Sequence, residues 1–86
     1  MKIKEGYIVR EVAGQIVVLP TGDDLDLNMM ITLNGTGRFL WHLLEKETDM
    51  RQLIDAVLSE YDVDEDTAKN AVSSFVEKLH EHGFLA

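Results

Sequence analysis

The 86-residue sequence predicts an α+β fold in which a three-stranded antiparallel sheet is followed by three helices. Up to Leu33, apolar residues occur in short β-branched or alternating runs broken by Gly and Pro, which is typical of strands. Beyond Asn34, apolar residues recur every three or four positions, which is typical of amphipathic helices. A chain of this length supports one modest core, so we expect a single domain over residues 1–86.

The first two strands are predicted at Tyr7–Val12 and Gln15–Leu19 because both runs are rich in β-branched residues. Only Ala13 and Gly14 separate them, which is the length of a two-residue hairpin loop. Gly14 can adopt the positive φ that such a turn requires. Pro20 has no N–H to donate, so it should end the second strand or lie on the unpaired side of that strand.

The third strand is predicted from the period-two alternation of Met29, Ile31 and Leu33 with their neighbours. It leads through Asn34 directly into a helix, with no hairpin partner after it, so we expect it to form an edge of the sheet. Met29 and Met30 should point to opposite faces. One of them should join the core, and the other requires solvent, a covering element or a partner.

The first helix is predicted at Gly35–Lys46, with Trp41 inside the protein as its favoured anchor. An exposed binding hot spot is the less favoured alternative for Trp41. Thr48 is predicted as the N-cap of the second helix, with Asp49 in the first turn, where a carboxylate suits the helix dipole. The apolar face of this second helix continues to Tyr61.

The third helix should begin after Asp64 as N-cap and end near His82, with Gly83 as a left-handed C-cap. Its central apolar stripe consists of Ala68, Val72, Phe75 and Leu79. Ala71 and Val76 lie about 60° to either side of this stripe, so the apolar face is wider than a single seam requires. The extra width has two interpretations: contact with two neighbouring elements, or one wall of a groove whose other wall is the third strand.

The composition excludes several classes of function. The net charge of −8 disfavours nucleic acid and anionic membranes as partners, because both bind Lys and Arg. The absence of cysteine excludes disulfides and thiolate chemistry. With neither a signal-like apolar segment nor a run long enough to span a bilayer, we expect a cytoplasmic protein.

No arrangement of side chains predicts catalysis or a cofactor. His80 and His82 are too close in sequence to share a metal on one helix face, and all three histidines, His42 included, are expected at the surface. Asn34 and Thr36 are expected as helix caps rather than an anion site. The loop acids Asp23, Asp24 and Asp26 lack EF-hand spacing, so a solvated loop is favoured over calcium. We therefore predict that the protein is not an enzyme.

The order of several short motifs resembles the PqqD family, whose members are also described as recognition elements for ribosomally made, modified peptides. The resemblance extends from about Gly6 to Leu85. It rests on Leu33-Asn34 before the first helix, Trp41 and Leu44 within it, Tyr61-Asp62-Val63, Phe75-Val76, Leu79, and the Gly83-Phe84-Leu85 ending.

This resemblance implies a winged-helix-like domain that binds the leader segment of a precursor peptide and presents it to a modifying enzyme, commonly a radical SAM protein, as in PQQ biosynthesis. The leader would add as a strand to the third strand and pack against the third helix. The implied backbone contacts come from Met29, Met30, Ile31, Thr32 and Leu33. The implied groove side chains come from among Ala68, Val72, Phe75, Val76 and Leu79.

The charge of the protein and its exposed strand edge give two further expectations, and the architecture leaves one alternative function. A strongly acidic protein should favour a leader that carries some Lys or Arg. An exposed edge strand could also pair with a second copy, so a homodimer is possible on this interpretation. The alternative function is a winged-helix DNA-binding regulator, although the third helix carries two lysines against Glu65, Asp66, Glu77 and Glu81, the wrong sign for that task.

Overall fold

The computed structural model describes residues 1–21 and 31–86, and it confirms the α+β class. Three antiparallel strands form the sheet in the order β1-β2-β3: β1 is Tyr7–Val12, β2 is Gln15–Pro20 and β3 is Ile31–Leu33. The predicted acidic loop at 23–26, and with it Met29 and Met30, lies outside the described residues.

The β1–β2 hairpin closes through the predicted two-residue turn, in which Val12 pairs with Gln15. Gly14 has a φ of 79°, as expected, and Ala13 also has a positive φ, of 52°. Positive φ at both positions gives the turn the twist of the flanking strands. The sequence pattern did not predict that Ala13 would share this conformation.

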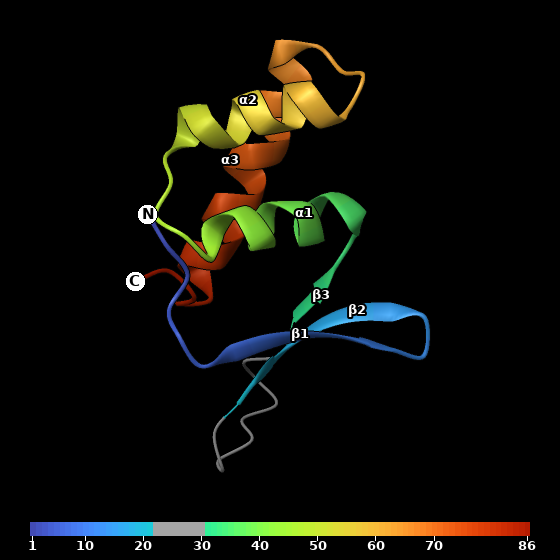
Figure 1. Ribbon diagram of the computed structural model, residues 1–86, viewed down its shortest axis with the longest axis vertical. Helices are drawn as coiled ribbons and strands as arrows, with labels where there is room; N and C mark the ends of the chain where they lie inside the picture. Colours follow the sequence, from blue (N-terminus) through green and yellow to red (C-terminus); the bar gives the residue numbers. More distant parts are fainter. Residues whose placement is uncertain (22–30) are drawn as a thin grey trace.

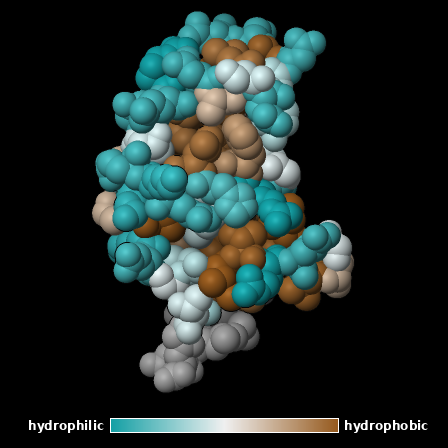
Figure 2. Space-filling view, in the orientation of Figure 1, coloured by the Kyte–Doolittle hydropathy of each residue, from teal (hydrophilic) through white to brown (hydrophobic). Residues whose placement is uncertain are grey.

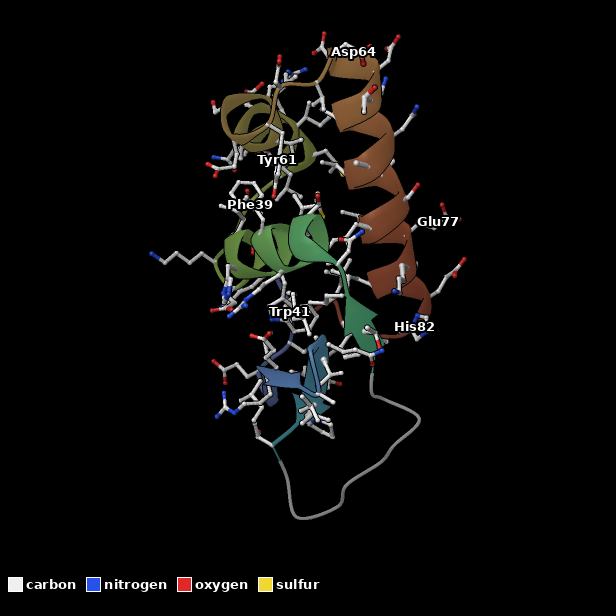
Figure 3. All side chains as sticks on the ribbon, turned by 90° about the vertical axis from the view of Figure 1, so that its right-hand side faces the viewer. Phe39, Trp41, Tyr61, Asp64, Glu77 and His82 are labelled. Carbon is white, nitrogen blue, oxygen red and sulfur yellow. The ribbon has the colours of Figure 1, made fainter. Side chains whose placement is uncertain are left out.

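The helices are α1 at Gly35–Leu44, α2 at Met50–Glu60 and α3 at Glu65–Glu81. Figure 1 shows α1 next to the sheet and α2 beyond it, farther from the strands. The long α3 runs past both other helices, and its C-terminal half lies beside β3 (Figures 1 and 3).

One predicted helix cap is wrong. Asp49, not Thr48, is the N-cap of α2, and its side chain accepts a hydrogen bond from the Gln52 amide at 2.8 Å. The Gln52 side chain accepts in return from the Asp49 amide at 3.1 Å, which completes a capping box. Thr48 has Arg51 three residues later and cannot form this reciprocal pair, so its hydroxyl donates to Gln52 instead.

The core lies between the sheet and the helices. Trp41 is 2% exposed, as predicted, and Figure 3 shows it projecting from α1 toward the strands. Its ring packs edge to face against Tyr7 of β1 and against Phe84, with centroid separations of 6.4 and 5.5 Å. Another edge-to-face pair, Phe39 and Tyr61 at 5.7 Å, lies between α1 and the end of α2, where Figure 2 shows apolar side chains gathered.

The C-terminal turn of α3 has the predicted glycine cap. Gly83 has a φ of 74°, and the Phe84 amide returns to donate to the Leu79 carbonyl at 2.9 Å. Phe84 is fully buried, and Leu85 forms a bridge with Ile3 near the start of the chain. The two ends of the chain therefore lie together beside α1 (Figure 1).

Candidate functional site: the edge of β3 and the face of α3

Within the described residues, β3 is paired on one side only. The strand order places it at the edge of the sheet, where Val17 of β2 lies opposite Thr32. On the other side, Nζ of Lys78 in α3 lies 3.4 Å from the Thr32 carbonyl oxygen. This carbonyl therefore points toward α3 and away from β2.

The orientation of Thr32 determines what the edge can offer. In an antiparallel pair, opposite residues exchange both ladder hydrogen bonds or neither. Because the Thr32 carbonyl faces outward, its N–H faces outward as well. The described part of β3 thus presents one donor and one acceptor to an added strand, both from Thr32.

A groove lies along this edge. Its volume is about 590 Å³, and it is bounded by β3, the start of α1 and the C-terminal half of α3. We call it the β3–α3 groove, and it is lined by Thr32, Leu33, Asn34, Thr36, Gly37, Leu40, Ala71, Ser74, Phe75 and Lys78.

The α3 wall of the groove is a single helical face. Ala71, Ser74, Phe75 and Lys78 are spaced i, i+3, i+4 and i+7, so they lie above one another on the helix. Phe75 is half-buried and packs against the core, and it supplies the large apolar surface of this wall.

A glycine brings the start of α1 close to this wall. A Cβ at Gly37 would lie 3.2 Å from Cε1 of Phe75 and 3.1 Å from Oδ1 of Asn34, which is tighter than ordinary packing. Asn34 caps α1, as predicted, by accepting from the Gly37 amide at 2.7 Å. The other expected cap, Thr36, lines the groove. The cap and the glycine together set where α1 begins against α3.

The other edge of the sheet, β1, lies along a different kind of surface. A hollow of about 490 Å³ there is lined by residues 2–10 together with Trp41, His42 and Glu45. Five of its lining residues carry full charges, three basic and two acidic, whereas the β3–α3 groove has Lys78 alone. An added strand with apolar side chains is therefore better matched to β3.

The sequence also matches a known protein family. Residues 15–85 match the family described as Coenzyme PQQ synthesis protein D (PqqD). The chain belongs to the PqqD family. The family assignment and the α+β fold implied by the resemblance are both confirmed. Among curated proteins, none matches the chain in sequence.

Two solved structures share the fold of this PqqD-family chain. One is described as TbiB1 in complex with the TbiA(beta) leader peptide: it is 25% identical, with a TM-score of 0.74, over 99% of this chain and 94% of that one. The other is lasso peptide synthetase B1 complexed with the leader peptide: it is 19% identical, with a TM-score of 0.72, over 96% of this chain and 93% of that one.

The predicted site residues that the structure describes fall into three groups: those that line the groove, those buried in the core, and one that is half-buried outside the groove. Of the strand residues, Thr32 and Leu33 line the groove, Ile31 is buried in the core, and Met29 and Met30 lie outside the described residues. Of the helix residues, Phe75 lines the groove and Val76 is half-buried without lining it. Ala68, Val72 and Leu79 are completely buried in the core.

Several residues that line the groove are not predicted by the sequence pattern. Ala71 lies on one side of the predicted apolar stripe, but Ser74 and Lys78 on the same face are polar and give no hydrophobic signal. The close approach of Gly37 to Phe75 could not be inferred without the packing of α1 on α3.

The structure also shows where the histidines lie and whether the described residues form a metal group or a membrane-spanning helix. His42, His80 and His82 are exposed, as expected. In residues 1–21 and 31–86, no three His, Cys, Asp or Glu side chains are grouped to hold a metal ion. No helix in the described part of the chain is long and apolar enough to cross a membrane.

Proposed function

We propose that this protein is a non-catalytic recognition module that binds the leader segment of a ribosomally made precursor peptide. The leader adds as a strand beside β3, and its side chains enter the β3–α3 groove. The observation that carries this proposal is the outward-facing backbone of Thr32 next to a groove of about 590 Å³. Membership of the PqqD family and the 25% identical fold of the TbiB1 leader complex support it.

The energetics require both the strand edge and the groove. Each ladder hydrogen bond contributes about 0.5–1.5 kcal/mol, so the two groups of Thr32 contribute about 1–3 kcal/mol. Ordering a flexible peptide costs on the order of 2–5 kcal/mol. The described backbone edge therefore does not bind a leader tightly by itself, and apolar side chains of the peptide must supply the rest by contact with Phe75 and Ala71, which are both partly exposed in the groove.

The partner of the complex is proposed to be an enzyme that modifies the peptide, of the radical SAM class found with PqqD-type proteins, as in the biosynthesis of PQQ or a related product. The chain itself is proposed to hold no cofactor. A short precursor frame and a radical SAM frame beside the gene are expected. A gene neighbourhood with no peptide-modifying enzyme would contradict this partner.

Binding can be tested with a phage-displayed library of random 12-residue peptides. We expect enrichment of peptides that, when titrated into ¹⁵N-labelled protein, shift the amide signals of Thr32, Leu33, Ala71 and Phe75. Shifts centred on β1 or on α2 would contradict the proposed site. Failure to enrich any peptide above a bare-resin control would contradict the function.

A gel shift at low salt tests the DNA-binding alternative. We expect no retardation of a random-sequence duplex, because the exposed residues of α3 include four acids and two lysines. Retarded DNA that is released by added salt would favour the regulator instead.

A further inference from the structure

The contact between Lys78 and β3 occupies the acceptor that an added strand would use. Nζ of Lys78 lies 3.4 Å from the Thr32 carbonyl oxygen, well beyond the usual length of about 2.7–2.9 Å for a charge-assisted hydrogen bond. Lys78 is also exposed. An incoming backbone N–H can therefore displace this ammonium at small cost.

We propose that Lys78 selects peptides with a carboxylate next to the residue that pairs with Thr32. This inference rests on the proposed function. When the strand takes the Thr32 carbonyl, the ammonium loses its acceptor while the bound peptide covers part of the groove mouth. A cation that is partly desolvated without a partner is destabilising. An Asp or Glu of the peptide restores the lost interaction and adds a charge-assisted bond.

The residues around Lys78 leave its ammonium group available to a carboxylate of the bound peptide. The other nine residues that line the groove are uncharged, so nothing there competes for the ammonium. The salt bridges found in the described parts of the chain join Met1, His42 and Arg51 to nearby carboxylates, and none involves Lys78.

This local preference differs from the one that the total charge implies. A net charge of −8 attracts basic peptides over a distance set by ionic strength, and so acts mainly on the association rate. A contact at the edge of the groove acts on the bound state and on the register of the added strand. The expected ligand therefore carries its acidic residue at one position, beside Thr32, with any basic residues elsewhere.

A different role for Lys78 makes a contrasting prediction. Lysines at sheet edges can block pairing with another copy of the protein. A lysine with that role alone would not influence which peptides bind, and its removal would increase self-association instead.

The experiment is a parallel selection of the random 12-residue library on three proteins: wild type, Lys78→Glu and Lys69→Glu. Lys69 is the matched control because it is an exposed lysine of the same helix that does not line the groove. We expect Asp and Glu to be enriched at one position with wild type and with Lys69→Glu. With Lys78→Glu, that position should change to Lys or Arg.

Affinities provide the quantitative check. Replacing the selected acid by its amide, Glu by Gln, should weaken binding to wild type about threefold to tenfold, as expected for a partly exposed ion pair. The same change should have no effect on binding to Lys78→Gln. Circular dichroism and size-exclusion chromatography should show each variant folded and in the wild-type oligomeric state.

The outcomes separate the inference from the proposed function. Peptides that shift the amide of Thr32 but show the same charge preference on all three proteins would overturn the role of Lys78 and leave peptide binding intact. Unchanged selection with increased self-association of Lys78→Gln would assign the edge-blocking role instead. If no peptide is enriched on any protein, both proposals fail.

Discussion

The substitution Phe75→Ala should distinguish the contribution of this side chain to peptide binding from its contribution to the stability of the core. Complete burial makes Phe→Ala substitutions cost about 3–5 kcal/mol, and the half-buried position of Phe75 reduces the expected loss to about 2 kcal/mol. A chain of 86 residues is typically stable by about 4–13 kcal/mol, so the variant should remain folded. Its Tm should fall by about 8–16 °C.

The same substitution should weaken peptide binding more than its effect on stability explains. Phe75 is the large apolar side chain on the α3 wall of the groove, so its removal should raise the Kd of a library-selected peptide about fivefold to thirtyfold. The matched control is Val76→Ala, because Val76 is the next residue, is also half-buried, and does not line the groove.

Isothermal titration of the selected peptide, with thermal melts of both variants, distinguishes the two effects. For Val76→Ala we expect a Tm loss of about 4–8 °C, from about 1 kcal/mol, and a Kd within about twofold of wild type. If Val76→Ala weakens binding and Phe75→Ala does not, the peptide binds on the Val76 side of α3 and not on the Ala71 side. That result would refute the argument.

Four further substitutions test the local structure by thermal melts. Asp49→Ala should cost about 1 kcal/mol by loss of the capping box, and Thr48→Ala should cost less; the reverse order would reinstate Thr48 as the cap. Gly83→Ala should also cost about 1 kcal/mol, because φ is 74° there, and an unchanged Tm would show that the last turn relaxes without it. Hydrogen bonds from the side chain and backbone of Thr67 lower the pKa of Asp64 below its ordinary value of 3.8, so this carboxylate stabilises α3 above that pH and the stability is lost as pH falls through the lowered pKa. Asp64→Asn should therefore lose less stability than wild type between pH 5 and pH 2, and parallel melting curves over that range would contradict the assignment.

Much of the fold could be predicted because local signals and packing agree. The hairpin, the three helices, the buried Trp41 and the Gly83 cap all follow from periodicity and from residues with special backbone or capping properties. The missed cap also had a visible signal. Asp49 is followed three residues later by Gln52, the spacing of a capping box, whereas Thr48 is followed by Arg51.

The site was harder to predict because it depends on how α3 is rotated against β3. Periodicity identified the stripe that enters the core, which includes Ala68, Val72 and Leu79. It placed Ala71 and Val76 symmetrically about that stripe and could not show that Ala71 faces the strand. A polar groove residue such as Lys78 cannot be found by a search for apolar positions.

The two faces of α3 have a consequence for how such a protein can diversify. Ala68, Val72 and Leu79 hold the helix in place, while Ser74 and Lys78 project from the neighbouring face into the groove. Substitution of Ser74 or Lys78 during evolution could therefore change which peptide is bound with little loss of folding stability. Divergent relatives would then keep the inward positions apolar while these outward positions vary with the peptide that each one serves.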